Sequence, residues 1–179
     1  MIERFQTTGK GSTLAQLSSY NGGVGGHRVK DTLCRCSPAF LESLLPAQGD
    51  ATLAVFLHVG TNDVTEECSL NNRQLADYLA LLRNLRFVLP QAKIYATGLF
   101  FRMTIFDDST AAIEASNQDI IKVVESINAT LPASQAVTFL PAPDIDMNCM
   151  MPDGVHLNSK GYAEWSSHLL HACSHHVVV

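Results

Sequence analysis

The chain has 179 residues, of which 46% are hydrophobic and 16% charged, a composition typical of a folded globular protein and not of a disordered one. Its 17 acidic and 12 basic residues give a formal net charge of −5. Because the basic residues are scattered, the sequence offers no basic stripe for nucleic acid or anionic lipid, and neither is an expected partner.

The first six residues lack the basic and apolar regions of a secretory signal, and no apolar run approaches the roughly 18 residues of a membrane span. We therefore expect a soluble, cytoplasmic protein that folds as a single domain over residues 1–179. The five cysteines form no repeated Cys-x-x-Cys pattern, so they indicate neither a disulfide framework nor a zinc site.

The N-terminal part contains weak signals. Residues 4–8 are a short and rather polar strand candidate, and residues 29–45 can hold one or two short helices around Pro38. Residues 53–57 then form a continuous apolar run that ends near Gly60, which is typical of a strand buried on both faces of a parallel sheet.

The second half alternates helices and strands. Leucines at helical spacing predict a helix over residues 75–89, and residues 94–99 are predicted as a strand. A helix over residues 113–131 and a strand over residues 136–140 follow. Ser159 is the expected cap of a last helix, whose inner stripe would be Tyr162, Trp165 and Leu169. This alternation predicts an α/β protein: a three-layer α/β/α sandwich around a central parallel sheet, with a flavodoxin-like plan.

In an open parallel sheet, ligands bind at the carboxyl ends of the strands. Two polar clusters lie at such places: residues 58–63 follow the first apolar strand, and residues 153–158 precede the last helix. In the second cluster, Asp153 stands three residues before His156, so its carboxylate can accept a hydrogen bond from Nδ1 and leave Nε2 to move a proton. The alternative is a surface turn with helix-capping polar residues.

The first cluster contains an amide at a strand end. The Asn62 side chain could donate to the oxyanion of a tetrahedral intermediate. A plain turn is the alternative, because Gly, Asn and Asp are the usual turn formers.

Together the two clusters resemble the SGNH (GDSL-like) hydrolases. Gly60-x-Asn62-Asp63 is similar to the third conserved block of that family, and Asp153-x-x-His156 is similar to the fifth. The likeness extends through Asn158 and Gly161-Tyr162, with Leu157 where many members have Pro. The resemblance implies the SGNH hydrolase fold and a serine esterase that needs no cofactor and no metal.

The resemblance also implies a nucleophile and a second oxyanion donor. The loop over residues 21–27 fits the family's glycine-rich loop, with the backbone N–H of Gly26 as donor; a flexible connector is the alternative. Where the family has Gly-Asp-Ser, this chain has Gly9-Lys10-Gly11-Ser12, and Ser12 is the expected nucleophile and a further N–H donor. Alternatives are Thr13, Ser18 or Ser19, or a helix-capping Ser12 in a chain without a nucleophile.

The sequence therefore predicts hydrolysis of a carboxylic ester, with a short acyl or acetyl group, through a triad of Ser12, His156 and Asp153. The substrate would be a small-molecule, carbohydrate or lipid ester. The alternative is an inactive SGNH-like module for binding or self-association, as part of a larger polyprotein or a retroelement protein. Residues 100–106 could line an acyl pocket, form a lid, or serve core packing or a dimer contact.

Overall fold

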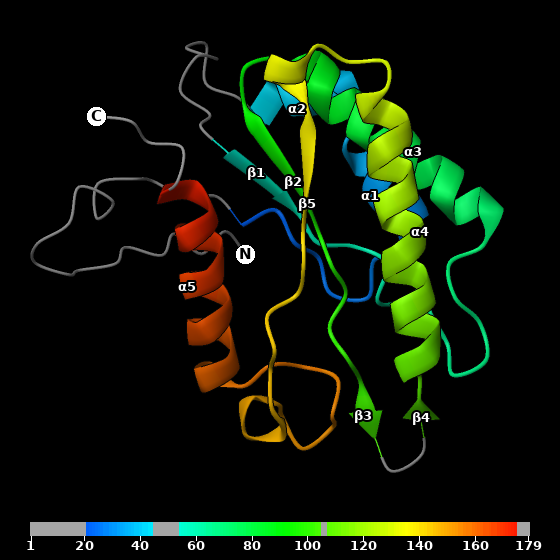
Figure 1. Ribbon diagram of the computed structural model, residues 1–179, viewed down its shortest axis with the longest axis vertical. Coiled ribbons are helices and arrows are strands. Elements are labelled where there is room, and N and C mark those ends of the chain that lie inside the picture. Colours follow the sequence, from blue (N-terminus) through cyan, green and yellow to red (C-terminus); the bar gives the residue numbers. More distant parts are fainter. Residues whose placement is uncertain (1–20, 45–53, 105–106, 175–179) are drawn as a thin grey trace, which may run out of the picture.

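The computed structural model describes residues 21–44, 54–104 and 107–174, and its centre is a parallel sheet of three strands (Figure 1). These strands are β1 (Ala54–Leu57), β2 (Lys93–Thr97) and β5 (Val137–Leu140), in the order β1-β2-β5. All three were predicted from apolar runs. The second strand ends two residues earlier than expected, because the backbone of Leu99 pairs with the Asn117 side chain and not with a neighbouring strand.

Helices cover both faces of this sheet. On one side lie α1 (Val29–Arg35), α2 (Pro38–Leu44), α3 (Asn72–Val88) and α4 (Thr110–Asn128). On the other side lies α5 (Ser159–Ser174), drawn in orange and red in Figure 1. The expected three-layer α/β/α architecture is thereby confirmed. The expected strand over residues 4–8 lies outside the described residues.

Short elements complete the chain. Two short 3₁₀ helices, η3 (Ala133–Gln135) and η4 (Met147–Cys149), flank β5. The small antiparallel pair β3 (Met103–Thr104) and β4 (Asp107–Asp108) stands before α4. In the described part of the chain, no helix has the length and apolar character needed to cross a bilayer.

The hydrophobic core lies between the sheet and the α1, α3 and α4 layer. Ile113, Ile120 and Ile127 of α4 are at most 1% exposed, and Leu81 and Leu82 of α3 are fully buried. Full burial of such a side chain contributes about 1.5–3 kcal/mol. Among the described residues, no residue of α5 belongs to this core cluster. The α1, α3 and α4 layer is therefore held by the buried apolar core, whereas α5 packs on the sheet without contributing to it.

The start of α5 differs from the expectation in two respects. Ser159 is already the first helical residue, and the cap is Asn158, whose Oδ1 accepts hydrogen bonds from the backbone N–H groups of Lys160 (2.9 Å) and Gly161 (3.1 Å). Tyr162 is 54% exposed and is not part of the inner stripe, whereas Trp165 and Leu169 are half-buried as expected. Gly161 takes the inner position, and no larger residue fits there, because a Cβ would collide with the carbonyl oxygen of Cys149.

Candidate active site

The segments that carry the predicted site residues follow the carboxyl ends of two parallel strands. Residues 58–63 come directly after β1, and residues 141–158 connect β5 to α5. Because β1, β2 and β5 are parallel, these ends share one edge of the sheet, at the lower side of Figure 1. The described site residues therefore belong to one end of the molecule.

Asp153 and His156 contact each other directly. The Asp153 Oδ2 lies 2.8 Å from His156 Nδ1, while Oδ1 accepts the backbone N–H groups of Val155 (2.9 Å) and His156 (3.0 Å). The hydrogen bonds from these two N–H groups and from the imidazole lower the pKa of Asp153 to about 2. The carboxylate is thus ionised at neutral pH and selects the tautomer in which Nδ1 carries the proton, so Nε2 is the nitrogen that can accept one.

The loop that carries this pair is fastened to the preceding segment. The backbone N–H of Met151 donates to the His156 carbonyl (2.7 Å), and Met150 pairs with Leu157 in an isolated bridge. The Asn158 Nδ2 donates to the carbonyls of Asn148 (2.8 Å) and Met150 (3.0 Å). Asn158 therefore joins the start of α5, the His156 loop and η4 through both ends of one amide.

Asn62 lies against the glycine-rich turn. Its Nδ2 donates to the carbonyl of His27 at 2.9 Å, which uses one of its two N–H bonds and fixes the orientation of the amide. Gly26, the neighbour of His27, has a φ of 78° in a turn that the His27 N–H closes onto the Val24 carbonyl. Glycine is needed here because of this positive φ and not because of crowding, since a Cβ would have open space around it. Through this contact the structure brings together two of the three expected oxyanion donors, Asn62 and Gly26, while the third, Ser12, lies outside the described residues.

Asp63 holds these two loops in register. Its Oδ2 accepts the backbone N–H of Val29 at the start of α1 (2.9 Å), and its Oδ1 accepts Nε2 of Gln74 on α3 (3.0 Å). Burial raises the pKa of the Asp63 carboxyl above its ordinary value, and the two hydrogen bonds oppose that shift. The sequence pointed to Asp63 as part of a block, but its role in fixing the glycine-rich turn requires the fold.

His58 joins the site to α5. Thr97 Oγ1 donates its one hydrogen to the Leu57 carbonyl (3.1 Å), so it must accept from His58 Nδ1 at 2.8 Å. The imidazole lies 4.8 Å from the Phe100 ring and 5.6 Å from Trp165, measured between centroids. Although part of the residue is exposed, desolvation lowers the pKa of His58 to about 4. His58 is thus a neutral hydrogen-bonded ring at the sheet edge.

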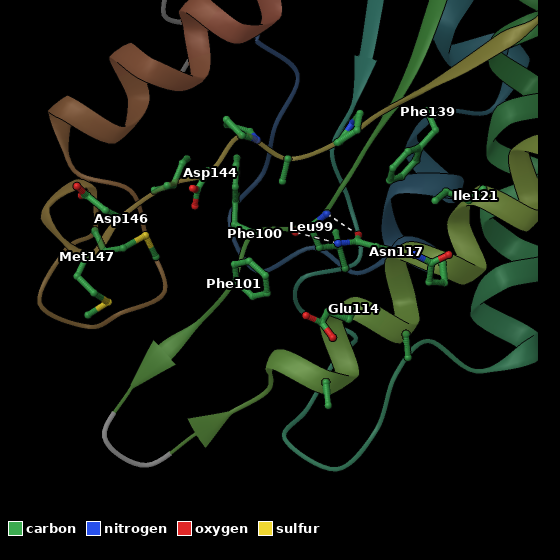
Figure 2. A pocket seen from close by; sticks show the side chains of 18 residues that line it. Leu99, Phe100, Phe101, Glu114, Asn117, Ile121, Phe139, Asp144, Asp146 and Met147 are labelled. Atoms are coloured by element: carbon green, nitrogen blue, oxygen red, sulfur yellow. Dashed lines mark hydrogen bonds between the residues drawn. The ribbon is translucent and has the colours of Figure 1, made fainter.

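The segment after β2 lines an open groove beside the site (Figure 2). Phe100 and Phe101 both border the groove, and Phe101 is 46% exposed. Residues 103–104 and 107–108 form the β3–β4 pair, while residues 105–106 lie outside the described ranges. The predicted nucleophile Ser12 and its alternatives Thr13, Ser18 and Ser19 also lie outside them. Across residues 21–44, 54–104 and 107–174, no group of three or more His, Cys, Asp or Glu side chains is arranged to hold a metal ion.

Comparison with known proteins agrees with this architecture. The family model of the GDSL-like lipases and acylhydrolases matches residues 7–164. No curated protein matches the chain.

Three solved structures are similar in fold. One, from Streptococcus pneumonia and described as that of a candidate platelet activating factor, has a TM-score of 0.66 at 21% identity and covers 86% of this chain and 71% of its own. A carbohydrate esterase family 3 protein from Talaromyces cellulolyticus has a TM-score of 0.60 at 20% identity, over 83% of this chain and 69% of its own. The family 3 carbohydrate esterase of Clostridium thermocellum has a TM-score of 0.58 at 20% identity, over 80% and 63%.

Proposed function

Since the chain belongs to the GDSL-like lipase/acylhydrolase family, we propose that it is a serine esterase that cleaves a carboxylic ester with a short acyl or acetyl group. The family supports ester hydrolysis in general. The observation that carries the finer proposal is the 2.8 Å contact between Asp153 Oδ2 and His156 Nδ1, in a loop at the same sheet edge as Asn62.

The reaction begins with Ser12. His156 Nε2 takes the proton of the Ser12 hydroxyl as its oxygen attacks the ester carbonyl, and Asp153 stabilises the imidazolium that forms. The alcohol oxygen then leaves with this proton, which produces the acyl-enzyme. Water, deprotonated by His156 in the second half, attacks the acyl group and releases the acid and the Ser12 hydroxyl.

The oxyanion of the tetrahedral intermediate is bound by three donors. The Asn62 Nδ2 has a second hydrogen besides the one given to His27, and it supplies the side-chain donor. The backbone N–H of Gly26 supplies another; no acceptor for it is found among the described residues. The N–H of Ser12 is the third. Loss of one such donor typically costs about 2.7–4 kcal/mol of transition-state stabilisation.

Hydrolysis of p-nitrophenyl acetate tests the proposal. His156→Ala and Ser12→Ala should each lower kcat at least about 10³-fold, because each removes a group that makes or moves the reacting bond. Ser166→Ala is the matched control: among the described residues, this exposed α5 serine donates only to the Tyr162 carbonyl, and the variant should retain the rate.

The other outcomes separate the alternatives. A Ser12→Ala variant that keeps its rate, beside an inactive His156→Ala, would place the nucleophile at Thr13, Ser18 or Ser19. Absence of hydrolysis in every form of the folded protein would refute the esterase and favour the binding module.

A further inference from the structure

An open groove of about 1040 Å³ lies beside the proposed site, between α4 and the segment over residues 141–150. Its floor is apolar: Leu99, Phe100 and Phe139 follow or belong to β2 and β5, and Ile121 contributes from α4. Figure 2 shows the Phe101 ring between the wall that carries Asp144 and the helix that carries Glu114. The groove can therefore hold a compact apolar group in contact with aromatic surface.

The charge around this groove has one sign. Among the described residues, its lining contains three carboxylates, Glu114, Asp144 and Asp146, and no lysine, arginine or histidine. Asp146 is partly neutralised, because Lys160 Nζ lies 4.0 Å from its Oδ2. Glu114 and Asp144 are exposed, and no basic side chain in the described part of the chain forms an ion pair with either. Two carboxylates on opposite walls, neither of them paired with a described basic residue, thus face the same apolar space.

The position of the groove selects the part of the ester that enters it. Its 141–150 wall continues directly into the His156 loop, through the Met150–Leu157 bridge and the hydrogen bond from Met151 to His156. In ester cleavage the imidazolium gives its proton to the leaving oxygen, so the alcohol portion is the part nearest to His156. The acyl carbonyl is directed toward the donors at Asn62 and Gly26.

We propose that this groove binds the alcohol portion of a cationic ester, with an alkylammonium group against Phe101 and between Glu114 and Asp144. The inference rests on the esterase function proposed above and adds its substrate class. A quaternary ammonium group is apolar in surface and positive in charge, which matches an apolar floor with acidic walls, and aromatic rings attract such cations. An anionic alcohol portion would be repelled by the same carboxylates.

A pair of matched esters tests the substrate class. Acetylthiocholine carries a trimethylammonium cation where S-(3,3-dimethylbutyl) thioacetate carries a neutral tert-butyl group, and the two esters are otherwise alike. Release of the thiol product measures the hydrolysis of each. We expect kcat/KM to be about tenfold higher for the cationic ester, in line with one aromatic contact and nearby carboxylates. The double variant Glu114→Gln, Asp144→Asn should bring the ratio close to one. Asp119→Asn, which removes an α4 carboxylate that pairs with Lys122, should leave the ratio unchanged.

Binding of the alcohol alone separates this inference from the esterase function. Trp165 is the single tryptophan, and its ring lies 4.8 Å from that of Phe100, which lines the groove, so tryptophan emission should report occupancy. Choline should change the emission at concentrations where 3,3-dimethylbutan-1-ol does not, and the double variant should lose the response, even in a protein with no esterase activity. An equal response to both alcohols, or a kcat/KM ratio that survives the double variant, would overturn the proposal. Failure to hydrolyse either ester, with choline binding intact, would refute only the esterase.

Discussion

Replacement of Asn158 by alanine should destabilise the protein and misplace His156 without removing any group that contacts substrate. Asn158 caps α5 through Oδ1, and such a cap contributes about 1 kcal/mol. Its two hydrogen bonds to the carbonyls of Asn148 and Met150 contribute about 1 kcal/mol each. Asn158→Ala should therefore lower the free energy of unfolding by about 3 kcal/mol.

Asn158→Asp separates the two ends of the amide. The aspartate keeps an oxygen for the cap, but it loses both donors and sets its second oxygen against the Asn148 and Met150 carbonyls, so at least about 2 kcal/mol should be lost. Urea unfolding followed by circular dichroism gives both values, and the hydrolysis rate of each folded variant reports the placement of His156. A loss below about 1 kcal/mol in the alanine variant, together with a wild-type rate, would show that Asn158 does not hold the loop.

Asp153→Asn should lower kcat about 10³- to 10⁴-fold, because an amide at this position favours the wrong imidazole tautomer. The control Asp119→Asn should change kcat less than about twofold. Comparable rates in the two variants would contradict the role of the Asp153 carboxylate. The free energy of unfolding should rise between pH 4 and 6.5. In this range His58 is protonated in the unfolded chain, where its pKa is 6.5, but neutral in the folded protein, where its pKa is about 4, so the unfolded chain binds more protons. His58→Gln should flatten this slope in urea titrations at a series of pH values, and an unchanged slope would exclude the effect. Ile120→Ala removes a fully buried side chain and should lower the free energy of unfolding by about 2–5 kcal/mol, measured as a lower urea midpoint. A decrease under about 1 kcal/mol would mean that the core closes around the cavity.

Much of the fold could be predicted because it follows from local patterns. The buried runs of β1, β2 and β5 and the 3.6-residue spacing in α3 and α4 each lie within one stretch of sequence. The sequence places the cap of α5 one residue too late, because Asn and Ser are both good caps and the choice depends on which of them reaches η4. The helical spacing predicts an inward Tyr162, but the close approach of Gly161 to Cys149 turns this side chain outward.

The candidate site divides in the same way. The contact between Asp153 and His156 spans three residues and could be expected from the motif. The hydrogen bond from Asn62 to His27 joins residues 35 apart, and the packing of Phe100 on Trp165 joins still more distant ones, so neither can be derived from local spacing. The groove and its one-sided charge depend on β2, α4 and the 141–150 segment meeting at one edge, which only the folded chain defines.

The uneven distribution of the core has a consequence for how the protein would fail under heat. Helix α5 and the loop that carries His156 share no residue with the core cluster in the described ranges, and α5 meets the sheet through half-buried rings and a few hydrogen bonds, such as that from Tyr95 Oη to the Ala172 carbonyl. Regions with few buried apolar contacts open at a lower free energy than the whole molecule. On warming, the α5 layer should detach first, so hydrolysis should cease at a temperature at which α3, α4 and the sheet still hold together.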